Sequence, residues 1–141
     1  MSTFEFTPLP VPPSIAGESP FWHPGEQALY WVDIAGHKLN RFVPACAAHA
    51  QWSFPTEVCS IAPRPDGGVL MARRDGLFHF DVETGRSQRI LAAPYDTGKL
   101  RFNDGKADPQ GRFWVGTIHD ERLPKGSLYC LTPHSLDRIV D

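Results

Sequence analysis

The densest group of side chains that could do chemistry lies in residues 100–117, LRFNDGKADPQGRFWVGT. Arg101, Asn103, Asp104 and Lys106 place two cations, an amide and a carboxylate within one short stretch. Such groups can bind and orient a polar substrate through charge-assisted hydrogen bonds. The stretch is too polar for the interior of an ordinary strand, and we expect it at the mouth of a β-structure, where functional sites are often built.

Further oxygen-bearing side chains occur outside this stretch. Glu18 lies among apolar neighbours in GESPFW, and Asp120 and Glu121 follow the apolar run 113–115. Carboxylate and amide oxygens suit a hard divalent cation, provided that the fold brings them together. A carboxylate that caps a turn is the alternative interpretation of Glu18. The motifs of nucleophilic hydrolases, zinc proteases and phosphate-binding loops are absent, and the six histidines do not cluster at metal-ligand spacing.

Three copies of a turn followed by an apolar run must position these residues. The turns contain Gly25, Gly67 and Gly111, which recur at intervals of roughly 40–45 residues. That interval is typical of a β-propeller blade of four short strands, whereas a β-sandwich lacks one fixed long period. The sequence therefore predicts an all-β protein with part of a β-propeller. We expect about three blades, at about 17–56, 57–98 and 99–141.

Residues 1–16 are expected to form an extended N-terminal segment. The four prolines of 8–13 exclude a central strand. The alternating segment Thr3–Thr7 could be a strand that closes the propeller ring, and a frayed tail is the alternative. The Ala-rich segment 45–54 has helix propensity, but its position within the first repeat predicts a loop and an outer strand.

Composition limits the classes of partner and compartment. With 14 Lys+Arg against 16 Asp+Glu and a pI near 6.3, the chain lacks the basic surface of a nucleic-acid-binding protein. The pair Arg73-Arg74 is interpreted as part of a solvated face. Three widely spaced cysteines, Cys46, Cys59 and Cys130, argue against a disulfide framework and favour the reducing cytoplasm. We found neither a secretory signal nor an apolar run of about 20 residues, so no membrane association is expected.

Four segments together resemble the gluconolactonase, senescence marker protein and regucalcin family. They are GESPFW (17–22), LYWVDI (29–34), RFNDGKADPQGRFWVGT (101–117) and GSLYCL (126–131). The resemblance begins at about residue 14 and continues to the end, and the R-F-N-D-G-K-x-D-P-x-G-R block is highly specific. It implies a six-bladed propeller with one divalent metal ion (calcium, zinc or similar) in the central channel, and the hydrolysis of a sugar lactone.

The resemblance also implies a role for individual residues. Glu18 would be a metal ligand, Arg101 and Asn103 would contact the substrate or a metal-bound water, and Glu121 would be a further substrate-binding carboxylate. The family's other ligands, an Asn and an Asp that acts as general base, belong to later blades. We therefore expect them beyond residue 141, and we expect no catalytic residue within this chain.

On this interpretation the chain is the N-terminal half of a propeller. The complete propeller would hydrolyse a small sugar lactone. The half-ring would self-associate or pair with a C-terminal half. The alternatives are a non-catalytic calcium- or sugar-binding propeller module and a fragment that is inactive on its own.

Overall fold

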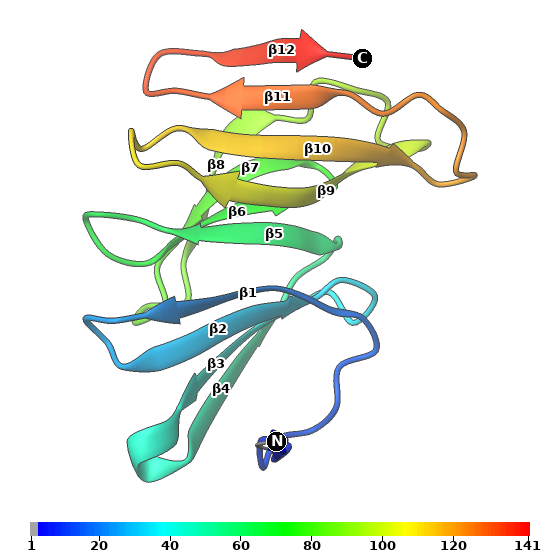
Figure 1. Cartoon of the computed structure of the whole chain (residues 1–141). Helices are drawn as coiled ribbons and strands as arrows, with labels where there is room; N and C mark the ends of the chain where they lie inside the picture. Colours follow the sequence, from blue (N-terminus) through cyan, green and yellow to red (C-terminus); the bar gives the residue numbers. More distant parts are fainter. Residues whose placement is uncertain (1–2) are drawn as a thin grey trace.

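The structure, a computed structural model that describes residues 3–141, consists almost wholly of β-strands (Figure 1). These residues form three antiparallel sheets of four strands each, and the prediction of an all-β protein is confirmed. The first sheet contains β1 (Gly17–His23), β2 (Ala28–Asp33), β3 (Lys38–Val43) and β4 (Ala48–Ser53). The second contains β5 (Val58–Pro63), β6 (Val69–Arg73), β7 (Gly76–Phe80) and β8 (Ser87–Ala92). The third contains β9 (Leu100–Ala107), β10 (Phe113–His119), β11 (Leu128–Leu131) and β12 (Leu136–Val140).

Each sheet is a meander, and its first strand lies innermost. Strand β5 packs beside both β1 and β9, and the remaining strands of each sheet extend outward from them (Figure 1). This is the arrangement of propeller blades. We call the edge where β1, β5 and β9 begin the N-terminal rim, and the edge where they end the C-terminal rim.

Two apolar cores hold the sheets together. Tyr30 and Val32 of β2 pack with Met71 of β6 between the first and second sheets. Ala72 of β6 packs with Val115 of β10 between the second and third sheets. Because successive side chains of a strand point to opposite faces, β6 is buried on both sides, which explains its continuous apolar sequence.

The turn that joins β9 to β10 is organised by Asp108. Its carboxylate accepts hydrogen bonds from the backbone N–H groups of Gln110 and Arg112, both at 3.0 Å, and from Trp114 Nε1 at 2.9 Å. The bond from Trp114, with the Arg112 donors, lowers the pKa of Asp108 to about 2. Gly111 adopts a φ of 78°, which favours glycine. Several residues of the D-P-x-G-R segment therefore shape a turn.

The N-terminal segment forms no strand between residues 3 and 16. The proposed ring-closing role of Thr3–Thr7 stays a prediction, and residues 1–2 lie outside the described part. Residues 45–54 contain the end of a short 3-10 turn, Pro44–Cys46, and strand β4, as the repeat predicted. Within residues 3–141, no helix is long and apolar enough to cross a membrane.

Candidate functional site

All three innermost strands carry a β-bulge close to the N-terminal rim. The bulges lie at Ser19–Pro20 in β1, at Cys59 in β5 and at Asn103–Asp104 in β9. A bulge bends its strand and redirects side chains, and bulges are common beside active sites. Here they occur on adjacent strands, and two of them adjoin or contain candidate site residues.

The structure brings Arg101 and Asn103 together on β9. Arg101 Nη1 donates hydrogen bonds to Asn103 Oδ1 at 3.1 Å and to the carbonyl oxygen of Phe102 at 2.9 Å. Both side chains are partly buried, and these contacts fix the guanidinium beside the amide. A pre-oriented Arg–Asn pair can hold a carbonyl or hydroxyl oxygen without reorganising when the substrate binds.

Cys59 lies beside Arg101 on the neighbouring strand β5. Burial raises the pKa of the Cys59 thiol to about 12, although the nearby Arg101 guanidinium acts in the opposite direction. The thiolate is the nucleophilic form of cysteine, and it is scarcely populated at neutral pH with such a pKa. Cys59 is therefore a packing residue of the site and not its nucleophile.

Glu18 is exposed near the beginning of β1, and hydrogen bonds fix the backbone on both sides of it. The next residue, Ser19, has a φ of 51°, and its Oγ accepts a hydrogen bond from Ile61 N of the second sheet at 3.1 Å. The preceding Ile15 and Ala16 donate backbone hydrogen bonds of 2.9 Å to the buried carboxylate of Asp33. The Glu18 carboxylate is consequently presented at the N-terminal rim from a fixed backbone.

Arg74, in the turn after β6, links the second and third sheets at the same rim. Its guanidinium forms two hydrogen bonds of 2.8 Å with the carboxylate of Glu57, and bonds of 2.9 and 3.1 Å with that of Asp120. It also donates to the carbonyl oxygens of Thr97 and Leu100. The Arg74 bonds lower the pKa of both carboxyl groups and raise the pKa of Arg74.

The interpretation of Arg73-Arg74 as part of a solvated face is wrong. Arg73 is only 4% exposed, and its guanidinium lies 4.1 Å from the ring centroid of Phe78. Arg74 is used in the inter-sheet network. The signal available in the sequence was the position of the pair, between a buried strand and an Asp-Gly turn.

Asp120 and Glu121 follow β10, and the structure distinguishes them. Asp120 is bound to Arg74, whereas the carboxylate of Glu121 is exposed and forms no hydrogen bond within residues 3–141. The Glu121 backbone N–H donates to Nδ1 of the buried His119 at 3.2 Å, which fixes the turn. Of the two carboxylates, Glu121 is the one available to a ligand.

The donor atoms at this rim suit a hard cation, but the described residues do not form a complete cation site. Glu18 offers a carboxylate, and Asn103 offers an amide oxygen that accepts from Arg101. Within residues 3–141, no three His, Cys, Asp or Glu side chains come together at metal-ligand spacing. Glu18 could therefore be one ligand of a cation whose other ligands come from elsewhere.

A comparison with protein families decides the relationship. The profile of the SMP-30/Gluconolactonase/LRE-like region matches residues 16–141. The chain belongs to this family. The resemblance found in the four sequence segments is thus confirmed over nearly the whole chain.

Individual relatives of this family member include lactonases and regucalcins. The 6-deoxy-6-sulfogluconolactonase of Pseudomonas putida is 37% identical over 81% of the chain and 39% of its own length. Regucalcin of Xenopus laevis is 35% identical over 89% of the chain and 44% of its own length. The crystal structure of a calcium-binding protein, regucalcin, from Agrobacterium tumefaciens superposes with a TM-score of 0.86 at 26% identity. That superposition covers 92% of the chain and 44% of the regucalcin.

The chain spans less than half the length of the relatives that it matches. The β-propeller fold predicted for it is confirmed by the superposition, and a lactone-hydrolysing family is supported by the names of its relatives.

We predict that Arg74→Met destabilises the protein by about 2 kcal/mol, because it leaves two carboxylates without their cation. The loss is smaller than for a fully buried pair, since Asp120 retains 40% exposure. Chemical denaturation measures it. In the matched control Arg74→Lys, the charge is kept but the two-sided fork is lost, so we expect an intermediate loss. Equal stability of Arg74→Met and the parent would show that the network has no net effect.

Proposed function

We propose that this chain supplies one metal ligand and the substrate contacts of a divalent-cation-dependent sugar lactonase. Glu18 binds the cation, and Arg101, Asn103 and Glu121 bind the lactone. No general base is assigned within residues 1–141. Carboxylate and amide oxygens of this kind accept calcium, zinc and similar cations.

The observation that supports this proposal most strongly is the hydrogen-bonded pair Arg101–Asn103 at the bulge of β9. A site that only bound a cation would gain nothing from a guanidinium, because like charges repel. A lactone, in contrast, has a ring-ester carbonyl and several hydroxyl groups that accept hydrogen bonds. The names of two relatives, a sulfogluconolactonase and a pentonolactonase of Haloferax volcanii, are consistent with this substrate class.

The chemistry expected of each residue follows from its surroundings. The cation, when bound, would supply Lewis-acid polarisation of the ester carbonyl. Arg101 donates hydrogen bonds to the ester and hydroxyl oxygens of the lactone, both in the bound substrate and in the transition state. Asn103, held by Arg101, orients the reacting group, and the exposed Glu121 accepts hydrogen bonds from sugar hydroxyls. Arg74 keeps Asp120, the neighbour of Glu121, in position.

A non-catalytic role is the second candidate. Several relatives are regucalcins, and one solved relative is described as a calcium-binding protein. A calcium- or sugar-binding propeller would use Glu18 in the same way without turnover. The complete propeller, assayed for lactone hydrolysis with and without added divalent cation, separates the two. Cation-dependent turnover supports the enzyme, and cation binding without turnover supports the binding module.

We predict that Glu18→Gln weakens cation affinity by roughly tenfold or more, since it removes a charge from the ligand set while keeping its shape. Excess cation should restore part of the lost activity. Calorimetric titration with calcium and with zinc measures the affinity, and Glu5→Gln, in the exposed N-terminal segment, is the matched control. An unchanged affinity in Glu18→Gln would remove Glu18 from the metal site.

A further inference from the structure

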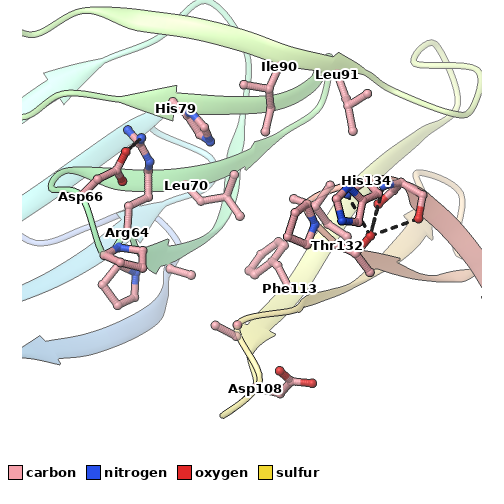
Figure 2. A pocket seen from close by; sticks show the side chains of 18 of the residues that line it. Arg64, Asp66, Leu70, His79, Ile90, Leu91, Asp108, Phe113, Thr132 and His134 are labelled. Carbon is pink, nitrogen blue, oxygen red and sulfur yellow. Dashed lines mark hydrogen bonds and ion pairs between the residues drawn. The ribbon is translucent and has the colours of Figure 1, made fainter.

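A groove of about 730 Å³ lies at the C-terminal rim, between the second and third sheets. It is bounded by the turns that follow β5, β9 and β11. Figure 2 shows His79, Ile90 and Leu91 on one wall, Phe113 and His134 on the other, and Arg64 with Asp66 at one end. Arg101 lies six residues from Ala107 along β9, so the groove is about 20 Å from the candidate lactone site.

The equivalent place between the first and second sheets is filled by large side chains. Tyr30 of β2 stacks on Phe21, with ring centroids 5.0 Å apart, and its hydroxyl donates to Glu26 at 2.6 Å. Arg41, the cross-strand neighbour of Tyr30, forms an ion pair of 2.9 Å with Glu26. Trp52 packs edge-on against Phe80. The hollow that remains there is smaller, about 450 Å³.

Strand register identifies the residues that replace this filling. Tyr30 lies between Phe21 and Arg41, and Leu70 lies between Ala62 and His79 in the same arrangement. Trp52 of β4 pairs with β3 in the first sheet, and Leu91 of β8 pairs in the same way with β7 in the second sheet. In the order Phe21, Tyr30, Arg41 and Trp52, the replacements are Ala62, Leu70, His79 and Leu91. Every replacement is smaller, so the groove results from a change of side chains within an otherwise repeated blade interface.

The walls of the groove combine an apolar surface with hydrogen-bond donors. Leu70 and Phe113 form the apolar part, and Leu91 is 37% exposed. Arg64 and His79 supply donors, and within residues 3–141 the His79 ring has no hydrogen-bond partner. Burial and the nearby Arg64 cation lower the pKa of His79.

Both carboxylates near the groove already have partners. Asp66 pairs with Arg64 and is 69% exposed, so it lies toward solvent. Asp108 accepts hydrogen bonds from its own turn and from Trp114. The guanidinium of Arg64 has further N–H donors besides the one used by Asp66. The groove therefore complements an apolar body that carries one negative group.

We propose that this groove binds a small amphipathic carboxylate, with its apolar ring against Leu70 and Phe113 and its acid group near Arg64 and His79. The volume lies within the range of small-molecule sites. None of the lining residues is a candidate lactonase residue, and the groove lies at the opposite rim, so the site is independent of the proposed lactonase function.

The test uses 2-naphthylacetate as the probe and the neutral 2-naphthylacetamide as its charge control, titrated by calorimetry into the purified protein near neutral pH. We expect the carboxylate to bind roughly tenfold more tightly than the amide, because hydrogen bonds to charged groups are the stronger ones. Arg64→Gln should abolish this preference and leave the amide affinity unchanged. Leu91→Trp should weaken the binding of both probes at least tenfold, because it fills the groove with the kind of side chain that Trp52 provides in the first sheet.

A control variant and a test of folding accompany these measurements. Leu123→Trp makes the same substitution at a position that is 41% exposed outside the groove, and it should leave both affinities unchanged. Circular dichroism and thermal unfolding establish that each variant is folded. Probe affinities that are equal for the acid and the amide, or that survive Leu91→Trp, would overturn the proposal.

Discussion

Replacing Asn103 by alanine is expected to lower turnover of a sugar lactone by about 10²–10³-fold, the usual effect of removing one oriented donor from a reacting centre. Arg101→Ala should act differently. The guanidinium contacts oxygens that are present both in the bound lactone and in the transition state, so its loss should chiefly raise KM. The Arg101–Asn103 hydrogen bond of 3.1 Å couples the two side chains, and Arg101→Ala should therefore also lower kcat moderately.

Steady-state kinetics on the protein that shows lactonase activity measures both effects. Asp104→Asn is the matched control, because Asp104 lies in the same bulge but is exposed, and its carboxylate accepts a hydrogen bond from its neighbour Gly105. The double variant Arg101→Ala/Asn103→Ala should lose less than the product of the single losses, since the residues are in contact. Kinetics of both single variants that match the parent would exclude the N-terminal rim of β9 from the site.

The repeat of turns and apolar runs was sufficient to predict the fold. Each copy places a Gly-containing turn before a buried strand, and the period corresponds to one four-stranded sheet. The burial of β6 on both faces follows from its unbroken apolar run between Val69 and Ala72. Periodicity is informative here because blades repeat the same packing problem at a fixed spacing.

The R-F-N-D-G-K-x-D-P-x-G-R block contains both residues that shape a turn and candidate site residues. The sequence alone does not distinguish the two groups. Asp108, Gly111 and Arg112 form a turn, and Gly105 leaves room for close packing, since a Cβ there would lie 2.8 Å from Ser60 Oγ. Arg101 and Asn103, in contrast, form the hydrogen-bonded pair that is proposed to contact the ligand. Motif recognition identifies the family, but only the hydrogen bonds distinguish the residues of the turn from the candidate site residues.

The roles of Arg73 and Arg74 were not predictable from local pattern. Two adjacent arginines beside an Asp-Gly turn are usually solvated, and here one is buried against Phe78 while the other joins Glu57 to Asp120. The partners are 17 and 46 residues away in the sequence. The pair with Asp120 depends on how two blades pack against each other, and the pair with Glu57 depends on how the strands of one blade pair. Residue type alone determines neither.

A polypeptide limited to residues 1–141 is expected to self-associate. Both apolar cores among the described residues lie against the second sheet, so the first and third sheets each keep one face without a neighbouring sheet. A face of this size exposes on the order of 400 Å² of apolar surface, or about 10 kcal/mol at about 25 cal/mol per Å². That is comparable with the stability of a typical domain, about 5–15 kcal/mol.

Light scattering with size-exclusion chromatography measures this directly, and a mass above the 15.7 kDa of one chain is the expected result. Leu29 and Leu128 alternate with the core residues Tyr30 and Tyr129, and so they lie on the two free faces. The double variant Leu29→Lys/Leu128→Lys should therefore shift the polypeptide toward the monomer. We also expect the 141-residue polypeptide to hydrolyse no lactone, because Glu18 is its one assigned metal ligand. A monomeric and active polypeptide would contradict both the free-face argument and the assignment of the missing ligands to other blades.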